Sequence, residues 1–231
     1  MFDPKKHGKV MYDLIKAIYR SPVGAYLGFK GGTMAYFFYG LDRFSVDLDF
    51  DLLNEEKKDY VFKTLTPIIG KYGGLKESKE KFYTLFYLLN YEKGVKNIKV
   101  EISKRKNEFN RYKIANFYGT DVKILGETDS FTNKLLAATT RKRLANRDFF
   151  DVNFYLKKDY SINEKIIKVV TGKDTKTYLK YLINFIEKNL INDTILHGLG
   201  ELVNEKQKFW IKNHLKEELL NRLKFLQDQI K

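Results

Sequence analysis

The chain has 231 residues, of which 43% are hydrophobic and 15% aromatic, and its 43 Lys and Arg against 29 Asp and Glu give a formal net charge of +14. This composition predicts a folded protein with a sizeable core, either one large domain or two small ones. The absence of cysteine excludes disulfides, thiolate zinc sites and cysteine nucleophiles. The three histidines are scattered, so a histidine-rich metal site is not expected.

The N-terminal residues lack the apolar core of a signal peptide, and no apolar run approaches the roughly 20 residues of a membrane span. We therefore expect a soluble, cytoplasmic protein without a membrane partner. The positive charge would attract polyanions such as RNA or nucleotides. Lysines that merely cover solvated faces would give the same charge, so charge alone does not identify the partner.

The first part of the chain predicts alternating helices and strands around a glycine turn. Ser21-Pro22 ends the first helix, and Gly40 ends the second. The turn itself is Gly31-Gly32-Thr33. The predicted elements are a helix over 8–20, a strand over 25–29, a helix over 33–38 and a strand over 46–52.

Alternation along the strand 46–52 places Asp47, Asp49 and Asp51 on one face. Three carboxylates on one face repel each other, and a cation would relieve this repulsion. Carboxylate oxygens suit Mg²⁺, which usually takes further oxygens from water and substrate phosphates. The Gly31-Gly32 turn lets backbone N–H groups and the next helix N-terminus approach a phosphate. Together these features predict a metal-dependent nucleotide site.

Each of these motifs alone has a simpler explanation. An Asp-x-Asp pair also occurs at solvated strand ends, in calcium loops and in sugar-nucleotide transferases. A Gly-Gly pair is more often an ordinary turn. The two motifs at this spacing, joined by a helix and by Arg43-Phe44-Ser45, are more specific than either motif alone.

A third acidic residue follows in the middle of the chain. Asn54 is expected to cap a helix that Pro67 interrupts and that ends at Gly73-Gly74. The strands expected next cover 81–91, 98–103 and 121–125. Pairing of the strand 98–103 beside 46–52 would bring Glu101 next to Asp47 and Asp49. Spacing alone favours the simpler explanation, in which Glu101 is a surface residue on a hairpin.

The second half of the chain is expected to be helical. Asp129 is expected to cap a helix that carries Lys134 and Arg141 on one face, and Arg147 begins another helix with Asp148 and Asp151 three residues apart. An exposed basic helix followed by an acidic first turn would give the same pattern. Further helices are expected over 175–190 and 205–230.

Two of these motifs resemble a known family. Lys30-Gly31-Gly32-Thr33, followed by Arg43-x-Ser45-x-Asp47-x-Asp49, resembles the signature of the AbiEii-type nucleotidyltransferase toxins, which belong to the polymerase-β-like nucleotidyltransferase superfamily. The later order of lysine, arginine and Arg-Asp-x-x-Asp is similar to the distal motifs of that family. The resemblance covers residues 25–155 and leaves open whether Asp148 or Asp151 is the functional distal aspartate.

The resemblance implies an enzyme that uses Mg²⁺ (or Mn²⁺) to move a nucleoside monophosphate from an NTP to an acceptor hydroxyl. The acceptor implied by analogy is RNA, at the 3′ end of tRNA, in a toxin–antitoxin or phage-defence setting with a cognate antitoxin protein. The implied roles are metal binding by Asp47, Asp49 and Glu101, nucleotide binding by Lys30, Gly31, Gly32, Thr33, Arg43, Ser45 and Arg141, and catalysis by Asp47, Asp49, Lys134 and Asp151.

We predict an α+β protein with a nucleotidyltransferase-type mixed-sheet domain over 1–125 and a helical C-terminal domain over 126–231. Three alternatives remain. The enzyme could modify a protein hydroxyl or a small molecule, although a small molecule gives the positive field no role. The scaffold could bind RNA or an antitoxin without turnover. A phosphatase of the Asp-x-Asp type is the third, and Phe50-Asp51 does not match its motif.

Overall fold

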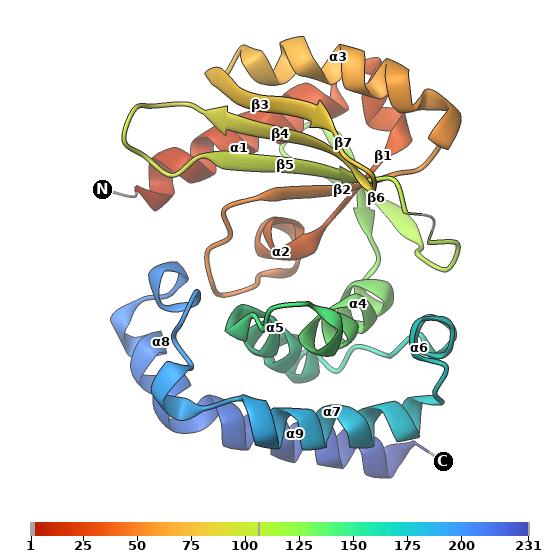
Figure 1. Ribbon diagram of the computed structural model, residues 1–231, viewed down its shortest axis with the longest axis vertical. Helices are drawn as coiled ribbons and strands as arrows, with labels where there is room; N and C mark the ends of the chain where they lie inside the picture. Colours follow the sequence, from red (N-terminus) through yellow and green to blue (C-terminus); the bar gives the residue numbers. More distant parts are fainter. Residues whose placement is uncertain (1–2, 106, 231) are drawn as a thin grey trace. The chain divides into compact units, whose positions relative to one another are not determined.

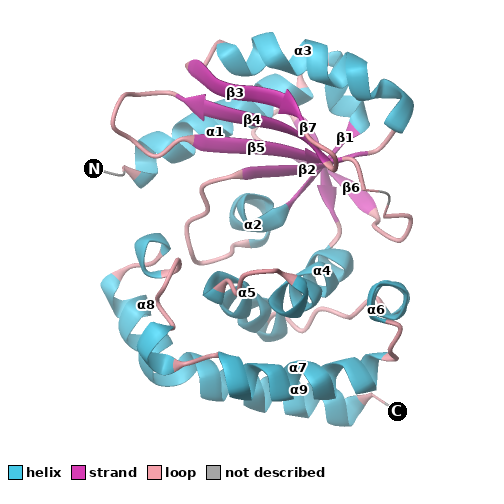
Figure 2. Cartoon of the chain, viewed as in Figure 1, coloured by secondary structure: helices cyan, strands magenta, loops and turns pink. Residues whose placement is uncertain are grey.

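The computed structural model describes residues 3–105 and 107–230, and the chain divides into two compact units. The first, which we call the α/β unit, comprises the chain up to Gly40 together with Phe44–Gly126. The second, the helical unit, comprises Leu41–Arg43 and the chain from Glu127 onward. Figure 2 shows strands in the α/β unit and helices throughout the helical unit. The predicted α+β class with a mixed sheet and a helical C-terminal region is confirmed.

The α/β unit is built on a seven-stranded sheet with the strand order β3-β4-β5-β2-β1-β7-β6. β1 runs parallel to β7 and β2 parallel to β5, whereas the other neighbours are antiparallel. The strands are β1 (Leu27–Lys30), β2 (Leu48–Leu52), β3 (Gly74–Glu80), β4 (Thr84–Asn90), β5 (Ile98–Ser103), β6 (Tyr112–Asn116) and β7 (Asp121–Leu125).

Helices α1 (Pro4–Tyr19) and α3 (Lys58–Gly70) cover one face of this sheet, and α2 (Gly31–Met34) lies against the other (Figure 1). The apolar face of the central strands packs under α3, where Tyr87 of β4 stacks on Phe62 with ring centroids 5.4 Å apart. Leu48, Phe50, Val100 and Ile102 are fully buried on this side. The alternate residues of β2 and β5 therefore present their polar side chains on the side of α2.

The helical unit contains the remaining helices of the described chain. Its elements are α4 (Glu127–Thr140), α5 (Asn146–Lys157), α6 (Glu164–Thr171), α7 (Thr175–Asn189), α8 (Glu205–Trp210) and α9 (Lys216–Gln229), with a π-helical turn over Ile211–Leu215 between the last two. Tyr178 and Leu182 of α7 and Leu219 of α9 are buried. Within the described residues, no helix is both long and apolar enough to span a bilayer.

Several local expectations need correction. β3 and β6 were not expected, because both are sheet edges and their charged or polar residues lack a buried alternating face. α3 continues through Pro67 and ends at Gly70. The proline removes only the one hydrogen bond that its own N–H would donate, and Val61, Leu65 and Ile69 on either side of it stay buried. α4 begins at Glu127, so Asp129 lies in its first turn and not at the N-cap. The Asp129 side chain instead accepts a 2.6 Å hydrogen bond from Asn163.

Candidate active site

The acidic residues of the central strands lie in register on one face of the sheet. In the parallel pair β2–β5, Asp49 lies opposite Glu101, and in the antiparallel pair β1–β2 it lies opposite Lys30. Asp47 immediately precedes β2. Because residues directly opposite each other in a sheet share a face, the structure brings Asp49 and Glu101 together from segments far apart in the chain.

The glycine turn after β1 packs directly against Asp49. Gly31 has a φ of +83°, a left-handed conformation that side chains rarely adopt, and a Cβ built there would lie 2.6 Å from Oδ2 of Asp49. Burial raises the pKa of Asp49 above its ordinary value, and nearby Lys99 is the strongest opposing influence. The turn therefore needs glycine for its conformation and for the space that the carboxylate occupies.

The hydroxyl of Thr33 donates a hydrogen bond to the backbone carbonyl of Asp47. Thr33 is fully buried, and Gly32 and Ser45 are also buried. α2 spans four residues and continues as a π-helical turn over Ala35–Tyr39, which ends at the left-handed Gly40. The predicted Gly-Gly-Thr turn thus anchors the segment that carries the first aspartate.

Asp51, the last acidic residue of β2, has protein partners of its own. Nζ of Lys30 lies 2.5 Å from its Oδ1, the Tyr112 hydroxyl donates to its Oδ2, and Asn110 lies 3.3 Å from the same oxygen. The Asp51 side chain is 7% exposed and that of Lys30 is 28% exposed. We infer that Asp51 links β1 and β2 to β6 and takes part of the charge of Lys30.

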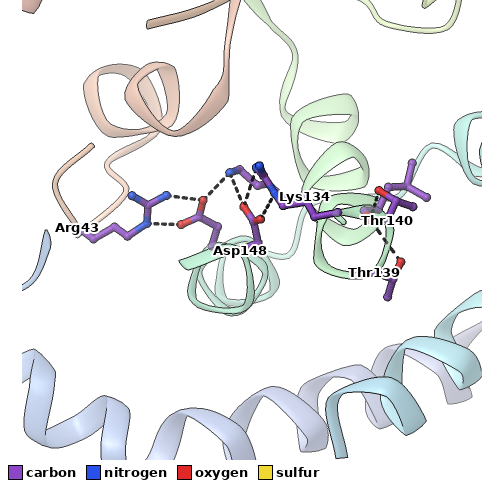
Figure 3. Close-up of polar contacts among 8 residues, drawn as sticks. Arg43, Lys134, Thr139, Thr140 and Asp148 are labelled. Atoms are coloured by element: carbon purple, nitrogen blue, oxygen red, sulfur yellow. Dashed lines mark hydrogen bonds and ion pairs between the residues drawn. The ribbon is translucent and has the colours of Figure 1, made fainter. Parts of the chain in front are cut away.

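The distal residues form a second charged cluster, in the helical unit, made of Arg43, Lys134, Arg141, Asp148 and Asp151. Arg43 binds Asp151 through two contacts, Nε to Oδ1 at 2.5 Å and a terminal nitrogen to Oδ2 at 2.7 Å. Lys134 on α4 lies 2.7 Å from Asp151 and 3.2 Å from Asp148, both on α5. Figure 3 shows the side chains of Arg43, Lys134 and Asp148 converging on this cluster.

The carboxylates of this cluster are paired with its cations. Asp148 and Asp151 are fully buried, and Arg141, just beyond α4, contacts Asp148 at 2.5 Å with a side chain that is 44% exposed. Burial alone would raise the pKa of Asp151, but Arg43 and then Lys134 reverse this and hold the pKa below its usual range. Buried carboxylates of this kind need such partners to remain charged.

A comparison with protein-family models identifies the family of the chain. The model of the nucleotidyl transferase AbiEii toxin of type IV toxin–antitoxin systems matches residues 13–224. The chain belongs to the AbiEii family. Membership makes it a nucleotidyltransferase of the toxin type and implies an NTP substrate and an antitoxin partner. A search of curated proteins finds no match.

Solved structures share the AbiEii fold of this chain. JHP933 from Helicobacter pylori has a TM-score of 0.62 and 21% identity, with 98% of this chain and 93% of that chain covered. A second H. pylori protein has a TM-score of 0.59 and 23% identity, with 96% of each chain covered. An antigenic nucleotidyltransferase-like protein from Paracoccidioides brasiliensis has a TM-score of 0.53 and 12% identity, with 87% and 97% covered.

The carboxylates of the AbiEii chain have suitable chemistry for a hard divalent cation. Among the described residues, no group of three or more acidic or histidine side chains is already arranged around one metal position. Mg²⁺ is nevertheless commonly bound through only one or two carboxylates together with substrate phosphates and water. Asp47 and Glu101, whose side chains are 22% and 30% exposed, are accessible for this role, and Asp49 lies beside them.

The residues predicted for the AbiEii site thus fall into two groups. Asp47, Asp49 and Glu101 lie in the α/β unit with the glycine turn, and Arg43, Lys134, Arg141 and Asp151 lie in the helical unit. Sequence reasoning did not assign a site role to Lys99, which contacts Asp47 and Glu101. Lys99 stands two residues before Glu101 and so lies on the same strand face, a spacing from which its contact with the acidic residues could have been predicted.

Proposed function

We propose that the chain is a Mg²⁺-dependent (or Mn²⁺-dependent) enzyme that moves a nucleoside monophosphate from an NTP to a hydroxyl of RNA, at the 3′ end of tRNA by analogy with its sequence motifs. The observation that carries this proposal is the register of Asp49 with Glu101 on neighbouring strands, with Gly31 packed against Asp49. This combination gives carboxylate oxygens beside a glycine turn, where a metal and phosphates are bound in nucleotide enzymes.

In this proposal Asp47, Asp49 and Glu101 hold the metal. A bound divalent cation neutralises charge on the phosphate oxygens. Gly31 and Gly32 allow close approach of the triphosphate to the backbone, while Thr33 fixes the position of Asp47 through its carbonyl. The chain's own contribution is to position these groups before the reaction.

The proposed reaction is a displacement at the α-phosphorus of the NTP. The acceptor oxygen forms a bond to this phosphorus and loses its proton, while the bond between the α-phosphorus and the bridging oxygen breaks. Pyrophosphate leaves with the electrons of that bond. The side chains form no covalent intermediate, so positioning and charge stabilisation account for the rate.

Lys134 and Arg141 are the proposed phosphate contacts of the helical unit, because each retains some solvent exposure, 11% and 44% of the side chain. Arg43 is buried against Asp151, and we propose that it acts indirectly. It holds Asp151, and Asp151 orients the Lys134 ammonium group. Lys30 would bind a phosphate by breaking its ion pair with Asp51. Ser45 would support the segment before Asp47.

The charge of the chain supports an RNA acceptor. The net charge is +14, and the exposed segment after α4 carries Arg141, Lys142 and Arg143 in succession. Phosphate backbones bind such surfaces without regard to sequence. A cytoplasmic location, where NTPs and tRNA are available, is part of the same proposal.

The test uses purified protein, Mg²⁺, each α-³²P-labelled NTP and total cellular RNA, with Asp49→Asn as the inactive variant. Asp121→Asn, an exposed aspartate at the start of β7, is the matched control. We expect label on RNA with the wild type and the control but not with Asp49→Asn. Label on protein would indicate a protein acceptor. No transfer, with RNA binding unchanged by Asp49→Asn, would indicate a binding module.

A further inference from the structure

Lys99 places an ammonium group among the carboxylates of the α/β unit. It lies on β5 two residues before Glu101, so both side chains project from the same face of the sheet. Its Nζ is 2.9 Å from Glu101 and 3.5 Å from Asp47. The side chain is 31% exposed. A single cation thus bridges the segment before β2 and the strand β5.

We propose that Lys99 is a built-in counterion that competes with the divalent cation for Asp47 and Glu101. This inference rests on the proposed function, in which these carboxylates bind the metal. An ammonium at hydrogen-bond distance and a divalent cation bound to the same oxygens would repel each other strongly. Lys99 therefore has to leave these carboxylates when the metal enters.

The surroundings favour this role over a simple surface ion pair. Exposed ion pairs contribute little, but Lys99 contacts two carboxylates at once. One is Glu101, which lies opposite Asp49 in the sheet, and the other is Asp47, which immediately precedes β2. Lys30 lies opposite Asp49 in the sheet, but its Nζ forms an ion pair with Asp51 at 2.5 Å. Lys99 is consequently well placed to reduce the repulsion between Asp47 and Glu101 when no divalent cation is bound.

A competing counterion has two measurable effects. It stabilises the protein in the absence of metal, because it offsets repulsion among the acidic side chains. It also weakens metal binding, since the metal must displace it. By contrast, a lysine that only contacted the substrate phosphates would affect NTP affinity and leave the affinity for metal alone unchanged.

The experiment compares Lys99→Gln with the wild type and with Lys76→Gln, which removes the same charge from an exposed position on the edge strand β3. Binding of Mn²⁺ alone is measured from the electron paramagnetic resonance signal of the free ion. Thermal unfolding is followed by circular dichroism in EDTA and in Mg²⁺. We expect Lys99→Gln to bind Mn²⁺ roughly tenfold more tightly or better, from the Coulomb energy of close charges.

We also expect Lys99→Gln to unfold at a lower temperature in EDTA and to gain more from Mg²⁺ than the wild type, whereas Lys76→Gln behaves as the wild type does. Equal Mn²⁺ affinity of Lys99→Gln and wild type overturns the inference, as does weaker NTP binding with unchanged Mn²⁺ affinity. If neither protein binds Mn²⁺ with or without NTP, the metal dependence of the proposed function fails as well. Mn²⁺ binding that is unchanged in the double variant Asp47→Asn/Glu101→Gln would show that these carboxylates do not hold the metal, and the proposed metal site would fail.

Discussion

Replacing Gly31 with alanine should disable the carboxylate site far more than it destabilises the fold. The new Cβ would lie 2.6 Å from Oδ2 and 3.1 Å from Cβ of Asp49, at a backbone φ of +83°. Gly94, in the turn between β4 and β5, has a φ of +81° with nothing within 4 Å of an added Cβ. Gly94→Ala therefore reproduces the backbone strain without the collision.

The structure sets the size of the two effects. A left-handed φ costs an ordinary residue roughly 1–2 kcal/mol, and both variants bear this cost. In Gly31→Ala the contact must also open from 2.6 Å to the 3.4 Å at which ordinary van der Waals contact begins, a difference of 0.8 Å. Because β2 is held between β1 and β5, the side chain of Asp49 has to move. Misplacement of about 1 Å at a reacting centre costs on the order of 100-fold in rate.

The assay measures label transfer from an α-³²P NTP together with the free energy of unfolding in urea. We expect Gly31→Ala to lose at least about 100-fold in transfer rate, while both variants lose similar stability. Mn²⁺ binding should also weaken in Gly31→Ala and stay unchanged in Gly94→Ala. If Gly31→Ala and Gly94→Ala retain equal activity, the assignment of Asp49 and its glycine neighbour to the site is refuted.

Two further predictions concern buried charges. Arg43→Leu leaves the buried Asp151 with fewer partners and should lower the free energy of unfolding in urea by about 3–5 kcal/mol. Adding Asp151→Leu to this variant should restore much of the lost stability. No recovery in the double variant would contradict the pairing of Arg43 with Asp151. Burial lowers the pKa of His7, so the unfolded chain binds more protons below the ordinary value of 6.5 and stability should fall as pH drops through this range. His7→Gln should flatten the dependence of stability on pH between about 7 and 5, and a slope equal to that of the wild type would argue against the buried neutral imidazole.

The central strands were predictable because their local pattern and their burial agree. β5 and β7 have the predicted bounds, 98–103 and 121–125, and β5 alternates buried apolar with partly exposed residues along its length. The edge strands β3 and β6 were missed, since an edge carries polar residues on both faces and is exposed to solvent. The sequence pattern therefore predicted the strands whose apolar residues are buried, and it did not predict the edge strands.

The charged residues show what a linear pattern does not contain. Spacing indicated that Asp148 and Asp151 share a helix face, and Lys134 contacts both. The pairing of Arg43 with Asp151 joins positions 108 residues apart and depends on Leu41–Arg43 belonging to the helical unit. Asp51 looked equivalent to Asp49 by alternation, but a tyrosine on the edge strand β6 binds it. Such partners are set by tertiary contacts and not by local periodicity.

The most direct test of the central claim asks which phosphorus of the NTP reaches the acceptor. Parallel reactions with the same NTP labelled at the α or the γ phosphate, total RNA and Mg²⁺ would be resolved into RNA, pyrophosphate and phosphate. We predict that the α label moves to RNA and the γ label leaves in pyrophosphate, in equal amounts and only with an intact Asp49. Transfer of the γ label, or release of the α label as free nucleotide without a modified acceptor, would contradict nucleotidyl transfer.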